Sequence, residues 1–163
     1  MSRQTLLAGL AGLLVVASGI GLLLLGTRKS HLRLEGKILK VRTYPLEDRA
    51  TAVVADFRVH NPSEVLFVVR DLEAELETAD GKRIEAGIFA EIDAERLFRY
   101  YPLIGQKYNP TLLARDRIKP GETLDRMVAL RVDLPESEVQ ARRNLRIRII
   151  DVDRIARPVI AER

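Results

Sequence analysis

The chain has 163 residues, enough for one membrane segment and one domain of about 130 residues. Its 27 Lys and Arg residues outnumber its 23 Asp and Glu residues, but Arg3, Arg28 and Lys29 lie in an N-terminal stretch of 30 residues that has no acid. The other 24 basic residues balance the 23 acids, which excludes a strongly basic nucleic-acid-binding surface. The chain has no cysteine, which excludes disulfides, thiolate metal sites, a cysteine nucleophile and the lipid-bearing cysteine of a lipoprotein.

Residues 5–26 form an uncharged, apolar run. At about 1.5 Å per residue a helix of this length spans roughly 33 Å, which matches a hydrocarbon core of about 30 Å. We therefore predict a transmembrane helix at 5–26 that inserts in the lipid bilayer, with a short tail at 1–4 and a linker at 27–31. A cleaved signal peptide is the alternative, but its small residues, Ala17 to Gly19, would lie inside the apolar run.

The sequence supports two membrane orientations. Arg28, Lys29, Arg33 and Lys37 follow the predicted helix, and basic residues favour the cytoplasmic side. A very short tail before a long apolar helix is also the form of an uncleaved signal anchor, which exports the domain. We expect a single-pass membrane protein with an extracytoplasmic, periplasmic domain, and the cytoplasmic orientation stays open.

From residue 32 onwards apolar and polar residues alternate, which predicts half-buried strands. The strands that we expect lie at 53–60, 72–77, 127–134 and 145–149. The apolar set changes parity near Arg70 and again around Gly36, which predicts bulges there. Turn signals separate the strands at Asn61-Pro62, Asp80-Gly81 and residues 119–122, and in the last of these Gly121 is expected to adopt a positive φ. The pattern predicts an antiparallel β-sandwich at residues 32–155, followed by a tail at 156–163.

Two short helices interrupt the strands. Asp93 is expected to cap a helix from Ala94 to Tyr101, which Pro102 ends. Pro135 suits the first position of a second helix that runs to Arg143. The first helix lies in an insert at about residues 89–115.

The order of the motifs resembles a known family. The segments that carry the likeness are DFRVHNPS (56–63), LEAELETADGKRI (72–84) and IKPGET (118–123). Together they resemble the late-embryogenesis-abundant proteins of the water-stress and hypersensitive-response (WHy) type, over about residues 32–152. The resemblance implies an all-β, immunoglobulin-like or fibronectin-III-like sandwich, often with an N-terminal membrane helix, and a non-enzymatic role linked to stress tolerance or lipid contact. The insert is longer than the connection that the family usually has there.

The insert is also rich in aromatic residues. Five of the eight aromatics of the chain, Phe89, Phe98, Tyr100, Tyr101 and Tyr108, lie within twenty residues, beside several cations. One interpretation is a binding surface for a protein, lipid or glycan formed by Phe98, Tyr100, Tyr101 and Tyr108. The other is a cap over one open end of the sandwich, with Leu97, Phe98 and Tyr101 packed inward.

The sequence offers little for catalysis. His31 and His60 have no serine motif or metal-ligand spacing around them, and no phosphate-binding glycine loop is present. The pairs Asp151–Asp153 and Glu73–Glu75 could hold a hard cation, but solvated charge explains them more simply. We expect no catalytic residue, cofactor or metal, and predict a membrane-anchored binding or structural module, related to stress or the envelope. The alternative is an accessory subunit of a membrane enzyme or transport complex.

Overall fold

The computed structural model describes residues 33–153 and 158–162, together with Val16 and Ser18. The predicted transmembrane helix, tail and linker at residues 1–31 lie outside the described residues, apart from these two. Among the residues that the structure does describe, no helix has the length and apolar character that crossing a bilayer requires.

Within this described part, eight antiparallel strands make up most of the domain. They are β1 (Glu35–Glu47), β2 (Ala50–His60), β3 (Phe67–Glu77), β4 (Arg83–Ile88), β5 (Arg117–Ile118), β6 (Thr123–Val132), β7 (Asn144–Asp151) and β8 (Val159–Ala161). The helical segments are α2 (Glu91–Tyr100), the 3-10 turn η1 (Pro102–Ile104) and α3 (Glu136–Gln140). The second predicted helix is therefore shorter than expected, and Pro135 precedes it rather than opening it.

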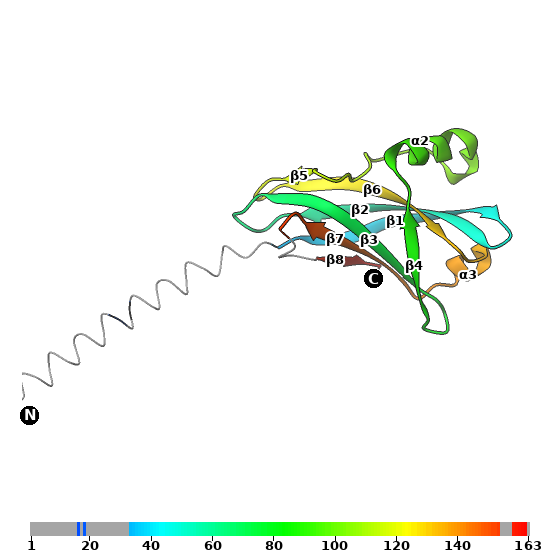
Figure 1. Cartoon of the computed structure of the whole chain (residues 1–163), viewed down its shortest axis with the longest axis horizontal. Helices are drawn as coiled ribbons and strands as arrows, with labels where there is room; N and C mark the ends of the chain where they lie inside the picture. Colours follow the sequence, from blue (N-terminus) through cyan, green and yellow to red (C-terminus); the bar gives the residue numbers. More distant parts are fainter. Residues whose placement is uncertain (1–15, 17, 19–32, 154–157, 163) are drawn as a thin grey trace, which may run out of the picture.

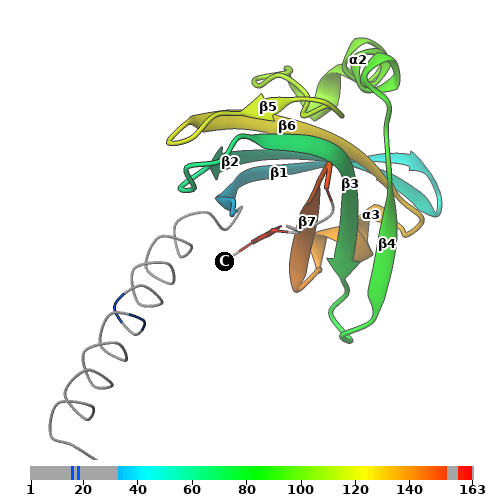
Figure 2. The same ribbon diagram turned by 60° about the vertical axis from the view of Figure 1, so that its left-hand side comes forward.

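The strands form two packed layers, which confirms the predicted β-sandwich (Figure 1). Strands β1, β2 and β6 form one layer, and β3, β7 and β8 lie in the other. Strand β4 belongs to both, because its first part pairs with β3 and its last two residues, Gly87 and Ile88, pair with β6. Figure 2 shows this strand crossing from one layer to the other.

The main core fills the space between the layers. Alternate residues of the strands point inward, as the period of two predicts, and Phe57, Phe67, Leu130 and Ile147 are fully buried there. Each such side chain contributes roughly 2 kcal/mol through its removal from water. The residues that we predicted as a C-terminal tail also take part: β8 pairs with β7, and Ile160 is 1% exposed.

One predicted bulge is confirmed and the other is displaced. The pairing of β3 with β7 shifts between Val69 and Asp71, so Arg70 is the extra residue. In β1 the shift falls between Ile38 and Lys40 rather than at Gly36. Gly36 instead allows a close approach, since a Cβ there would lie 2.5 Å from a backbone oxygen of β2 and 2.9 Å from Ile160.

Two of the predicted turns meet in a single hydrogen-bonded junction. The Asn61 N–H donates to the Glu122 carbonyl at 3.0 Å, and the Gly121 N–H donates to the Asn61 carbonyl at 2.8 Å. Gly121 has φ 72°, as predicted. The buried Asn61 side chain donates to the carbonyls of Val65 (2.8 Å) and Ile118 (2.9 Å), and its oxygen accepts from Ser63. The Asn61 side chain thus joins the loop after β2 to the last residue of β5.

We predict that Asn61→Ala lowers the free energy of unfolding by about 2–4 kcal/mol, because it removes the buried amide that donates to two carbonyls and the oxygen that accepts from Ser63. The measurement is urea denaturation of the full chain in detergent micelles, followed by circular dichroism. Asn144→Ala is the control, since the buried Oδ1 of Asn144 has no hydrogen-bond partner in the described part of the chain. Equal losses from the two variants would contradict the structural role of Asn61.

Candidate functional site

The insert covers the outer face of the first layer. Ala52 and Val54 of β2 and Met127 and Ala129 of β6 point away from the main core, yet each is fully buried. Our expectation of half-buried strands is therefore wrong for this part of β2 and β6. The small side chains leave room for α2, which packs Ala94 and Leu97 against them.

The helix α2 begins earlier than predicted. Its first residue is Glu91 and the residue before it is Ala90, so Asp93 is not its N-cap. Asp93 lies inside the first turn, where its carboxylate accepts a hydrogen bond from Arg96 at 3.1 Å. The acids Glu91 and Asp93 in this turn are favourably placed in the field of the helix dipole.

The aromatic residues divide into two groups. Phe89, Phe98 and Tyr101 pack against the second hydrophobic cluster, and the Tyr101 ring lies 5.1 Å from that of Tyr44 on β1. Inward packing of Phe98 and Tyr101 was part of the cap interpretation, and the structure confirms it. The helix, however, lies on the outer face of a layer and not over an open end of the sandwich.

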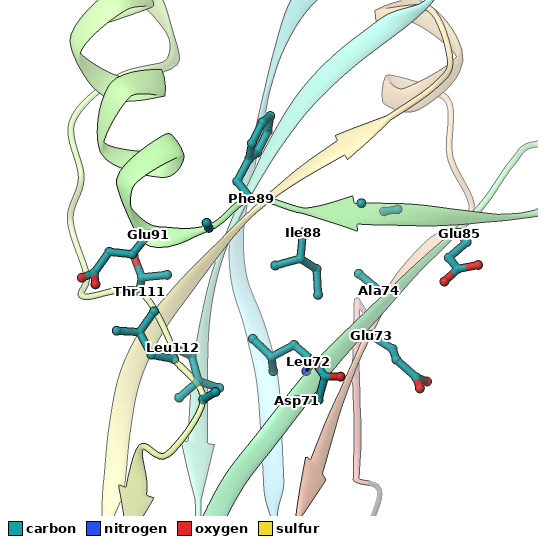
Figure 3. Close-up of a pocket in the computed structure, with 15 residues that line it drawn as sticks. Asp71, Leu72, Glu73, Ala74, Glu85, Ile88, Phe89, Glu91, Thr111 and Leu112 are labelled. Atoms are coloured by element: carbon teal, nitrogen blue, oxygen red, sulfur yellow. Dashed lines mark hydrogen bonds between the residues drawn. The ribbon is translucent and has the colours of Figure 1, made fainter.

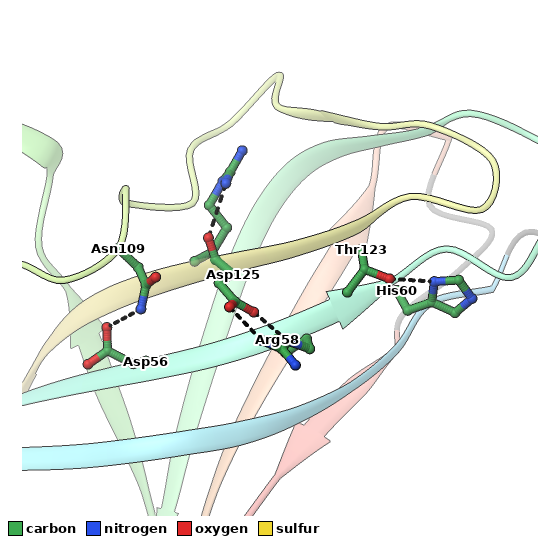
Figure 4. Close-up of polar contacts among 7 residues, drawn as sticks. Asp56, Arg58, His60, Asn109, Thr123 and Asp125 are labelled. Atoms are coloured by element: carbon green, nitrogen blue, oxygen red, sulfur yellow. Dashed lines mark hydrogen bonds and ion pairs between the residues drawn. The ribbon is translucent and has the colours of Figure 1, made fainter.

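A buried ion pair fixes the insert to the sheet. The Arg42 guanidinium of β1 donates to the Asp56 carboxylate of β2 at 2.9 Å, and their side chains are only 10% and 5% exposed. Arg42 also donates to the carbonyls of Ile104 (3.0 Å) and Gln106 (2.7 Å) in the insert. From the same insert, the Asn109 amide donates to the other Asp56 oxygen at 2.9 Å (Figure 4). Two strand residues therefore bind three positions of the insert.

Two rings of the insert lie over the same guanidinium. The Arg42 carbon Cζ is 5.6 Å from the centre of the Phe98 ring and 5.0 Å from that of Tyr108, while the Lys40 ammonium is 5.4 Å from Tyr108. These cation–π contacts add to the ion pair. Although Tyr108 is 60% exposed, this contact with Arg42 helps to hold the insert against the sheet.

Beyond Asp56, the outer face of β2 becomes polar (Figure 4). Arg58 makes two hydrogen bonds to Asp125, at 2.6 and 2.7 Å, and His60 contacts the Thr123 hydroxyl at 3.0 Å. The hydrogen bonds from Arg58 hold the pKa of the Asp125 carboxyl below its usual value. The sequence-predicted alternation is correct for this half of the strand.

The outward side of the insert exposes three large apolar side chains among charged residues of α2. Tyr100 is 69% exposed and Leu103, in η1, is 84% exposed. Ile92, on the outer side of α2, is also exposed. Of the four predicted binding residues, Tyr100 thus belongs to an open surface, whereas Phe98 and Tyr101 are packed and Tyr108 stacks on Arg42. Leu103 and Ile92 were not predicted, because the pattern that singled out the insert is its density of aromatic residues.

A shallow cleft of about 270 Å³ lies beside Tyr100. Leu46, Phe89 and Leu97 supply apolar lining, and charged groups of both signs surround it. They are Glu47, Asp93, Arg96 and Arg131. The pKa of Arg131 is raised because its guanidinium donates to Asp133 and faces Glu47. We call Ile92, Tyr100 and Leu103, together with this cleft, the insert surface.

The carboxylate pairs considered as cation sites have other partners. Glu73 pairs with Arg148, and Glu75 pairs with Arg146 at 3.1 Å, which forms a cross-strand ladder on the outer face of β3 and β7. Asp151 is 1% exposed and accepts a hydrogen bond from the Asp153 N–H. Among the described residues, no group of three or more His, Asp or Glu side chains is arranged to hold a metal ion.

No protein-family model matches the sequence, and no curated protein matches it. The structure is similar to that of an uncharacterised β-sandwich protein from Clostridium difficile 630, with 13% sequence identity and a TM-score of 0.41. That match covers 80% of this chain and 86% of the other.

We predict that Arg42→Ala lowers the free energy of unfolding by about 3–5 kcal/mol, because it leaves the Asp56 carboxylate buried without its counter-charge. The measurement is again urea denaturation of the full chain in micelles. Arg58→Ala is a matched control on the neighbouring strand, since the pair of Arg58 and Asp125 lies at the surface, with side chains 49% and 36% exposed. We expect only a small change for this control. Similar losses from the two variants would show that Arg42 does not anchor the insert.

Proposed function

We propose that this chain is a non-enzymatic binding module that recognises a partner protein through the insert surface. The observation that carries the proposal is the exposure of Tyr100 and Leu103 on a segment that the Arg42–Asp56 pair holds against the sheet. Large apolar side chains that gather on a surface mark interaction sites. Neither residue belongs to a hydrophobic core cluster of the described residues, so a role in stability does not account for them.

The rigidity of the insert favours binding. Binding to a surface that is already ordered costs less conformational entropy than binding to a loop that becomes ordered only in the complex. Tyrosine is also enriched among the residues that dominate binding energies. Tyr100 lies two residues after the packed Phe98, and its neighbour Tyr101 contacts Tyr44. The backbone that carries the exposed ring is therefore fixed by its neighbours before a partner binds.

The charges around the surface favour a protein over a lipid or glycan. Asp93, Glu47, Arg96 and Arg131 surround an apolar centre with both signs of charge. An apolar core with a polar, mixed rim is the usual arrangement at protein interfaces. A surface for anionic lipid headgroups needs an excess of Lys and Arg, whereas the two arginines that line this cleft are balanced by Glu47 and Asp93.

The tether and the finer fold assignment belong to the same proposal. The strand order supports a fibronectin-III-like sandwich of the WHy type. Strands β1, β2 and β6 lie side by side in one layer, and β3, β7 and β8 lie side by side in the other, with the first part of β4 next to β3. The apolar run at residues 5–26 supports a membrane helix, and we place the tethered domain in the periplasm. A compartment-specific reporter fused after Arg163 tests the orientation.

We predict that a photo-crosslinking residue at position 103 captures one protein partner in stoichiometric amount from cells that express the full chain. The double variant Tyr100→Ser and Leu103→Ser is expected to lose this partner while its melting temperature stays the same, because both side chains face solvent. Tyr101→Ser is the contrasting variant and is expected to lower the melting temperature, since its ring packs on Tyr44. A crosslinker at the exposed Lys119, on the turn before β6, is the negative control.

The outcomes separate the alternatives. A partner that is itself a membrane enzyme or transporter identifies the chain as an accessory subunit. Adducts with lipid or glycan alone contradict a protein-binding role, as does equal capture from positions 103 and 119. If the purified full chain turned over a substrate, the non-enzymatic assignment would be wrong.

A further inference from the structure

A second hollow, of about 440 Å³, opens where β4 leaves β3 (Figure 3). Its sides are residues 71–74 of β3, residues 85–91 of β4 and the start of α2, and residues 111–114. The last segment lies along β6, where Thr111 forms a bridge with Met127. We call this hollow the fork groove. It lies at the side of the sandwich where β4 passes from β3 in one layer to β6 in the other.

The groove exposes part of an unpaired strand edge. On this side of β3, Phe67 and Val68 pair with β5, and Val69 exchanges backbone hydrogen bonds with Arg115 and Asp116. Pairing resumes at Ala74 with β4. Between them the Leu72 N–H donates to the carboxylate of its own neighbour, Asp71, at 2.8 Å. The N–H and carbonyl of one residue point to the same side of an antiparallel strand, so the Leu72 carbonyl faces the same gap. The open edge is therefore short: it lies between Val69 and Ala74, and the Leu72 carbonyl is its free acceptor.

The floor of the groove is apolar and contains one polar atom without a partner. Leu72, Ala74, Ala86 and Leu112 line it, and all but Leu72 are buried. The Thr111 side chain also lines the groove, and this residue is only 6% exposed. Its Oγ1 makes no hydrogen bond to any of the described residues. A buried hydroxyl without a partner is unfavourable.

The rim of the groove is acidic. Asp71, Glu73, Glu85 and Glu91 line it, whereas no Lys, Arg or His does within the described part of the chain. Glu73 pairs with Arg148, but the other three carboxylates form no ion pair with described residues. The groove therefore carries a net negative charge above an apolar floor.

We infer that the fork groove binds an extended, basic segment of a partner polypeptide, which adds to β3 as a short strand beside Leu72. Side chains of a paired strand alternate in the same way as those of β3, where Leu72 and Ala74 face inward and Asp71 and Glu73 face outward. The segment that fits has apolar side chains that enter the groove and Lys or Arg side chains that meet the acidic rim. Addition of a strand to a sheet edge is a known mode of peptide recognition.

The test uses a fluorescent hexapeptide in which lysine and valine alternate, titrated against the full chain in detergent micelles at low ionic strength. We expect saturable binding by fluorescence anisotropy, and no binding of the peptide in which glutamate replaces lysine. A peptide with an N-methyl group on its central valine is expected to bind weakly, because strand addition needs that N–H. Amide hydrogen exchange at Leu72 is expected to slow when the unmodified peptide binds.

Two variants of the chain locate the site. Glu85→Gln with Glu91→Gln is expected to weaken binding about fivefold, since two exposed charge pairs are lost. Asp48→Asn with Glu64→Gln is the matched control, because it removes two exposed acids that do not line the groove.

The inference goes beyond the proposed function and can fail separately from it. Equal binding by the two double variants, or equal affinity for the acidic peptide, would overturn it. Binding that is insensitive to N-methylation, with no change at Leu72, would also overturn it, because a cationic ligand would then be held by charge alone. Tyr100→Ser with Leu103→Ser is expected to leave peptide binding unchanged, so loss of one site does not report on the other.

Discussion

The burial of β2 on both faces is the constraint on which the rest of the domain depends. Its inward residues, such as Phe57, build the main core, while Ala52 and Val54 on the opposite face support the insert. The Arg42–Asp56 pair lies at the border of this second cluster, where the outer face turns polar. A buried ion pair adds little to the stability of the fold by itself. It does disfavour other arrangements of the insert, because these would leave a buried charge unpaired. The pair therefore defines where the insert sits.

The strands were predictable because alternation and turn chemistry are local. The parity change at Arg70 and the positive φ of Gly121 follow from a few neighbouring residues, and both proved correct. Burial on two faces depends on what packs outside a strand, although the run of apolar residues at 52–55 is a signal that could have indicated it. β8 has three residues, too few for a period of two to be recognised, and its pairing partner is set by the whole sheet.

The location of the candidate site in the chain was predictable, but which of its side chains are exposed was not. The density of aromatic residues pointed to the insert, yet the sequence could not tell that Tyr100 faces solvent while Tyr101 packs on Tyr44. Arg42, Asp56 and Asn109 come together only through the register of β1 with β2 and the return of the insert. The fork groove arises where β4 changes partners, which no local pattern encodes.

The length of β1 also sets the distance between the insert and the N-terminal end of the domain. Tyr44, which contacts the insert, lies nine residues beyond Glu35, the first residue of the strand. At about 3.3 Å per residue the two are roughly 30 Å apart. The insert surface is therefore at the opposite end of the domain from the point where the N-terminal segment enters β1. If that segment is held in a bilayer, a partner of the insert surface binds roughly 30 Å of strand length away from the point of attachment.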